Sequence, residues 1–296
     1  MYDLDMRYFD FVEERHAAWQ RRQAGELGPW STDPIIAGRK FTNVYRVLDR
    51  GSQLLVRMLY DGGSPKDIFF RCFMYRYTNR PETWLWMRDK LGRWPGMRDL
   101  ETVGRLLKDL RSTGQPVFSG AYLIIPQPGH RGDKIDHVMD LIRVARRRVA
   151  RDYLAASGPQ DRFEMLRKLY GVGDFLSMQI LTDWGYSPYG SDDENDFIMP
   201  GPGCRKGIRA WGWTGDYVAG IRHAREFWAS ERSVLLGDRP PSLMDVQNTF
   251  CEFFKYDRYQ RKGGEHPAAY VSSYGPPPPL MLPVHWHVTP EPKGTK

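Results

Sequence analysis

Two short amphipathic segments meet at a Gly-Val-Gly corner near the middle of the chain, and this corner constrains the fold more than any other stretch. Apolar residues recur at helical spacing before it and after it: Phe163, Leu166, Leu169 and Tyr170, then Phe175, Met178, Ile180 and Leu181. Gly171 and Gly173 permit a turn too sharp for a side chain, so a helical hairpin is predicted. The first amides of the second helix then attract anions, above all phosphate. An ordinary core-packing hairpin is the alternative.

The corner also resembles the helix-hairpin-helix motif of DNA glycosylases, in which an apolar residue and any residue precede Gly-apolar-Gly. That superfamily has a catalytic aspartate downstream, and an acidic cluster stands at the matching distance here. Asp196 matches best and Asp193 second; helix capping or a solvated loop charge is the alternative for both. Bifunctional members carry a lysine where this chain has Phe175, so the resemblance implies no Schiff-base lyase step.

Charge and cysteine content limit the class of protein. The 296 residues include 43 basic and 36 acidic side chains, a net charge of +7, which is compatible with a polyanionic partner but does not require one. Neither a signal peptide nor an 18-residue apolar run is found, so we expect a soluble cytoplasmic protein. The three scattered cysteines fit a reducing compartment and cannot form a four-cysteine iron–sulfur site. No metal or other cofactor is indicated.

The apolar periodicity predicts a mainly all-α protein with few or no short strands. Besides the two helices of the hairpin, helices are expected over residues 3–23, 65–77, 98–113, 134–156, 216–230 and 242–257, and a loop is expected over 33–38. The helix over 134–156 carries a basic run that is either a solvated face or a stripe for the DNA backbone. The predicted domains are an N-terminal helix and loop (1–34), a catalytic domain of two helical lobes (35–260), and a proline-rich C-terminal tail (261–296).

Three further stretches are rich in polar residues. In the first, residues 39–50, Thr42 or Asn43 is predicted to cap a helix, while Arg46 and Asp49 either pair on its surface or form a face that contacts phosphate or a base. In the second, small residues at 201–204 precede Arg205 and Lys206, which suits close approach of a phosphate or a flipped nucleotide. In the third, an aromatic-rich helix carries an unusual polar set: Gln247, Asn248, Glu252 and Lys255.

Together these stretches resemble the helical-domain family named after 5-hydroxymethyldeoxyuridine DNA kinase, and its relatives, the alpha-glutamyl/putrescinyl-thymine pyrophosphorylases. The resemblance covers about residues 35–260 and rests on residues 41–46 with 49–50, 201–203 with 206–207, and 245–248 with 251–253 and 255–256. It implies a helix-hairpin-helix glycosylase-like fold and work on modified pyrimidines in DNA. The residues expected to line the base or substrate pocket are Arg39, Asn43, Arg46, Asp49, Gln247, Asn248, Glu252 and Lys255. The chain has no Gly-x-x-x-x-Gly-Lys-Ser/Thr phosphate loop.

Three functions follow from these features. The preferred one is a DNA glycosylase for phage-type DNA that flips a bulky hydroxymethylated or glucosylated pyrimidine and cleaves its N-glycosidic bond with Asp196 or Asp193. Double-stranded DNA would be held by Gly171, Val172, Gly173, Arg205 and Lys206. The alternative is a transferase that attaches an amino acid or polyamine to pyrophosphoryloxymethyl-uracil in DNA, with arginine and lysine side chains binding the leaving pyrophosphate. The third is a non-catalytic module that recognises modified DNA. Neither a membrane nor an obligate protein partner is indicated.

Overall fold

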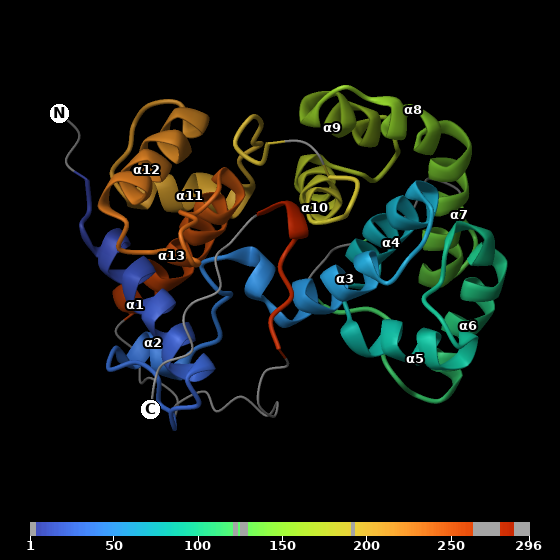
Figure 1. The fold of residues 1–296 in the computed structure, drawn as a ribbon, viewed down its shortest axis with the longest axis horizontal. Helices are drawn as coiled ribbons and strands as arrows, with labels where there is room; N and C mark the ends of the chain where they lie inside the picture. Colours follow the sequence, from blue (N-terminus) through green and yellow to red (C-terminus); the bar gives the residue numbers. More distant parts are fainter. Residues whose placement is uncertain (1–3, 121–123, 125–129, 191–192, 263–278, 287–296) are drawn as a thin grey trace. The chain divides into compact units, whose positions relative to one another are not determined.

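The chain forms an all-α fold, as predicted. The computed structural model describes residues 4–120, 124, 130–190, 193–262 and 279–286 (Figure 1). Over these ranges the chain has thirteen α-helices, three short 3-10 helices and no β-strand. None of the described helices is both long and apolar enough to cross a membrane. Contacts divide the chain into two units: Met1–Asp49, Ile198–Leu280 and Trp286–Lys296 form the first, and Arg50–Phe197 with Met281–His285 form the second.

The first unit is organised around one long helix. It contains α1 (Arg7–Gln23), α2 (Pro34–Gly38), a 3-10 turn η1 (Arg46–Leu48), α11 (Pro202–Ala210), α12 (Tyr217–Glu231) and α13 (Leu243–Lys262). All the other elements contact α13, which is drawn in orange-red in Figure 1. An aromatic core fixes this arrangement, because Tyr8 of α1 stacks on Phe250 of α13 with 4.3 Å between ring centroids, and Trp211 and Trp228 are buried beside them.

Glycines set the close approach of α11 to α13. A Cβ atom on Gly207 would lie 1.9 Å from the Phe250 carbonyl oxygen, and one on Gly203 would lie 2.5 Å from the Cys251 sulfur. The small residues in this stretch were expected to make room for a phosphate or a flipped nucleotide. At these two positions the room is filled by α13, so the glycines serve helix packing.

The second unit surrounds α4 (Pro65–Thr78), whose residues from Ile68 to Thr78 are all buried. The remaining helices are α3 (Arg50–Tyr60), α5 (Pro81–Leu91), α6 (Leu100–Ser112), α7 (Lys134–Arg148), α8 (Ala150–Ala155), α9 (Pro159–Arg167) and α10 (Asp174–Gly185), with a 3-10 turn η2 (Met97–Asp99). Arg76 of α4 forms a buried bidentate ion pair with Asp183 of α10. Trp84 and Trp94 are buried and Trp86 is half-buried.

Four predicted elements differ from the structure. Residues 34–38 form a helix because Pro34 begins it and the Asp33 carboxylate accepts the amides of Ile35 and Ile36. Asn43 caps no helix: its amide donates to Asp49 at 2.9 Å, and the α-helix begins only at Arg50. The helix expected over 134–156 breaks at Val149. Residues 202–210, for which no helix was predicted, are helical.

Part of the predicted tail is described. The last long helix extends to Lys262, and a 3-10 turn η3 (Val284–Trp286) follows near the end of the chain. In the second unit the Gln53 side chain donates to the Met281 carbonyl and accepts the Met281 amide. The described part of this proline-rich segment is therefore held by specific hydrogen bonds.

Candidate substrate site

The hairpin predicted at Gly171 is confirmed. Helices α9 and α10 flank it, Gly171 has a φ of +76°, and Val172 is 1% exposed. Gly173 is exposed, but Asp174 follows it in the first turn of α10 and pairs with Arg167 at 2.7 Å. A carboxylate at this position already supplies the negative charge that a helix N-terminus favours. Binding of DNA here stays a prediction.

The two aspartates assigned to base excision lie on the second unit. Asp193 and Asp196 are both exposed. The Asp193 carboxylate accepts the amide and the side-chain NH₂ of Asn195 at 2.9 and 3.0 Å, which is the geometry of an ordinary polar turn.

The predicted pocket residues meet largely in the first unit, where the loop before η1 lies along α13. Asn248 donates from its side chain to the Thr42 hydroxyl and to the Asn43 carbonyl, each at 3.0 Å. Glu252 accepts the Thr42 amide at 3.3 Å and pairs with Lys255 at 3.4 Å. Lys255 also donates to the Lys40 carbonyl. The ion pair of Glu252 and Lys255 is therefore joined to a larger polar arrangement.

Arg15 of α1 belongs to the same site and was missed by sequence analysis. It is 9% exposed, and its guanidinium carbon lies 5.4 Å from the centroid of the Phe41 ring. Among the described residues the Nη2 atom of Arg15 has no hydrogen-bond partner, although Asp49 and Glu252 are near enough to act on its charge. Its position one helical turn after Phe11, on the buried side of α1, was the signal available in the sequence. We call Arg15, Asp49, Asn248, Glu252 and Lys255 the polar cluster.

Burial changes the ionisation of two members of the polar cluster. It raises the pKa of Asp49 from 3.8 to about 6, against the opposing effects of the Asn43 amide and of the positive charges on Arg46 and Arg15. It also lowers the pKa of Arg15 to about 10, while Glu252 and Asp49 favour its charged form. The site therefore holds a carboxyl with a pKa of about 6 and a buried cation that acts on it from beyond ion-pair distance.

The other predicted pocket residues lie elsewhere or serve the framework. The amide of Arg46 donates to the buried Asp245 at 2.8 Å, and Arg46 itself is buried. Gln247 accepts the Gly201 amide at 2.9 Å and so ties α13 to the start of α11. Arg39 lies over the Tyr259 ring, 4.5 Å from its centroid. Their place in a substrate pocket stays a prediction.

The two predicted phosphate contacts are exposed on α11. Arg205 donates to the Pro200 carbonyl at 3.0 Å and lies near the Tyr217 ring, while Lys206 lies 5.4 Å from the centroid of Phe254. Both are attached to a rigid element of the first unit. Across the described part of the chain, no group of three or more His, Cys, Asp or Glu side chains is arranged to hold a metal ion.

Comparison with known proteins identifies the family. The family model described as "5-hmdU DNA kinase, helical domain" matches residues 4–265, so the chain belongs to this family. One curated relative is the 5-hmdU DNA kinase of Bacillus phage SP10, which is 27% identical over 230 residues. The match covers 69% of this chain and 35% of that relative, so the chain spans about a third of the relative's length. No solved structure matches.

These comparisons correct the preferred function. A kinase transfers a phosphoryl group and leaves the N-glycosidic bond intact, so the interpretation as a hydrolytic, base-flipping DNA glycosylase was wrong. They favour the transferase alternative, although the relative's name specifies phosphate transfer and not an amino acid or polyamine. The catalytic role predicted for Asp196 and Asp193 depended on base excision, so it is withdrawn together with that interpretation. Neither comparison establishes a relationship to helix-hairpin-helix glycosylases.

Proposed function

We propose that this chain recognises 5-hydroxymethyluracil in double-stranded DNA for transfer of a phosphoryl group to the hydroxymethyl oxygen. The observation that carries the proposal is the polar cluster, which joins Arg15 to residues from two of the three stretches that resemble the family. The family membership and the name of the phage relative supply the substrate class. A buried cation with an unused donor and a carboxyl of raised pKa suit a small polar substituent on a base.

Each charged group of the polar cluster has a chemical part in the proposal. The Nη2 atom of Arg15 would donate to the hydroxymethyl oxygen of the base, because a buried donor without a partner gains most from an acceptor. Asp49 would accept the proton of the hydroxymethyl group as the hydroxymethyl oxygen bonds to the γ-phosphorus of a nucleoside triphosphate. The bond between the γ-phosphorus and the nucleoside diphosphate then breaks, and the diphosphate leaves. Asn248, Glu252 and Lys255 would hold the loop that carries Asp49 against α13.

A binding measurement tests this function. Fluorescence anisotropy with duplexes that differ only at one central base should give tighter binding to 5-hydroxymethyluracil than to thymine. Arg15→Gln should weaken binding to the hydroxymethylated duplex by about 10- to 100-fold, because the hydrogen bond that it removes involves a charged donor. It should leave the thymine duplex nearly unaffected.

The matched control is Arg22→Gln. Arg22 is on the same helix, and its guanidinium also lies 5.4 Å from an aromatic ring, that of Trp30. This variant should keep the preference of the unaltered protein. Equal affinity of the unaltered protein for the two duplexes would refute the proposed substrate, and equal effects of the two variants would remove Arg15 from the site.

A further inference from the structure

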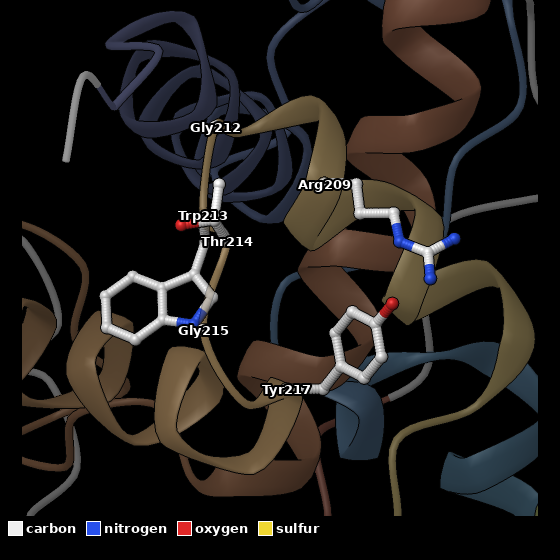
Figure 2. A pocket seen from close by; sticks show the side chains of 6 residues that line it. All are labelled: Arg209, Gly212, Trp213, Thr214, Gly215 and Tyr217. Carbon is white, nitrogen blue, oxygen red and sulfur yellow. The ribbon is translucent and has the colours of Figure 1, made fainter.

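A second site lies on the first unit, next to α13 but outside the polar cluster. A cavity of about 470 Å³ opens between the end of α11 and the start of α12. Its lining residues are Arg209, Gly212, Trp213, Thr214, Gly215 and Tyr217. Figure 2 shows the Arg209 guanidinium next to the Tyr217 ring, with the Trp213 indole on the opposite side of the loop. This volume is within the usual range for ligand sites.

Two arginines share the aromatic ring at this cavity. Arg205 and Arg209 are four residues apart on α11 and therefore lie on one face of the helix. Their guanidinium carbons lie 5.7 and 5.3 Å from the centroid of the Tyr217 ring. The ring attracts both cations through its face, so the two positive charges are held together before any ligand arrives.

A second pair of cations lies beside Phe254, and one of them, Lys206, is next to Arg205 in the sequence of α11. Lys206 of α11 and Arg258 of α13 lie 5.4 and 5.8 Å from the centroid of the Phe254 ring. We call Arg205, Lys206, Arg209 and Arg258 the α11 basic face. Over the part of the chain that the structure describes, none of the four forms an ion pair within 4 Å.

Two of the five arginines in the basic run over 143–151, in contrast, are paired with carboxylates. Arg143, in the basic run over 143–151, pairs with Glu101 at 2.6 Å and with Asp140 at 2.7 Å. Arg151 of the same run pairs with Asp152 at 2.9 Å. The α11 basic face keeps its charge for an external anion.

We propose that the α11 basic face, with the cavity at Arg209 and Tyr217, binds successive phosphates of a DNA strand. Guanidinium groups match phosphate oxygens in a bidentate manner, and four cations spread over two rings exceed what a single phosphate needs. The inference rests on the proposed function for the choice of DNA as substrate. It adds the surface that positions the duplex, since phosphate contacts fix the register while base contacts specify the target.

Salt dependence of DNA affinity tests this surface. The double variant Arg205→Gln/Arg209→Gln should lower the slope of log Kd against log salt concentration by about 0.9 for each phosphate that the variant no longer binds. The control is Arg88→Gln/Lys90→Gln, which removes the same charge from two exposed cations that also lie against tryptophan rings. That control should keep the slope. Circular dichroism confirms folding, and Arg209→Gln alone, with half the effect, replaces the double variant if the latter unfolds.

The outcomes separate this inference from the proposed function. The arginine variants should weaken binding to thymine and 5-hydroxymethyluracil duplexes equally, because phosphate contacts carry no base information. A reduced slope without any preference for the modified base would uphold the basic face and refute the substrate. An unchanged slope would overturn the basic face. Loss of ATP binding with an unchanged DNA slope would also overturn it and assign the cavity to a free nucleotide.

Discussion

Asp49 and Arg15 illustrate how burial alters single side chains. Both belong to the polar cluster, and each acts on the other's charge although neither is within ion-pair distance of the other. A charge that leaves water loses hydration, and only part of this loss is recovered from a distant opposite charge. The carboxyl therefore holds its proton more tightly, and the guanidinium holds its own less tightly.

The raised pKa of Asp49 predicts a pH dependence of stability. The folded-state pKa, about 6, exceeds the ordinary value of 3.8, so the folded protein binds this proton more tightly than the unfolded chain does. The contribution of Asp49 to the free energy of unfolding is then complete below about pH 4 and is lost as the pH rises to about 6.

Asp49→Asn should remove this loss, because asparagine resembles the neutral acid and still offers an oxygen to the Asn43 amide. Thermal denaturation of the unaltered protein and of the variant at pH 5 and at pH 7.5 tests this prediction. The Tm of the variant, relative to the unaltered protein, should be higher at pH 7.5 than at pH 5. A difference that does not change with pH would contradict the assigned pKa.

At the scale of elements, the packing of α11 against α13 depends on the absence of a side chain at Gly207. Gly207→Ala should push the helices apart, because the new Cβ would meet backbone atoms of Phe250 that cannot rotate away. We expect a loss of about 1–3 kcal/mol or more in the free energy of unfolding, measured by urea denaturation.

The matched control for this prediction is Gly185→Ala at the end of α10. Apart from the backbone of its own helix, no atom lies within 4 Å of a Cβ at that position, and alanine is the better helix former. This variant should be neutral or slightly stabilising. If both variants behave alike, close packing is not the reason for glycine at 207.

Most elements could be predicted from the sequence, but their polar partners could not. Apolar periodicity located the helices because it records one buried face per element. It missed α2 and α11, which are short and begin at proline, and it placed a helix cap at Thr42 or Asn43, whereas the Asn43 amide donates to Asp49. Arg15 is separated by 34 positions in sequence from Asp49, and only the packing of α1 on α13 brings the two into one site.

At the scale of the whole molecule, family membership makes a prediction about products. The chain belongs to a kinase-named family, so DNA that carries 5-hydroxymethyluracil should leave the protein with its N-glycosidic bonds intact. Incubation followed by alkali should give no strand breaks above a buffer control, and nucleoside analysis should detect no released base. Abasic sites formed in proportion to protein concentration would contradict this expectation.

Helix α13 carries Asn248, Glu252 and Lys255 along one face and Phe254 with Arg258 along another, so one continuous helix serves both proposed contacts. A helix rises about 1.5 Å per residue and does not stretch. The distance between the proposed base contact and the proposed phosphate contacts is therefore fixed by the helix. A DNA whose backbone geometry changes that separation would be rejected even with the correct base in place.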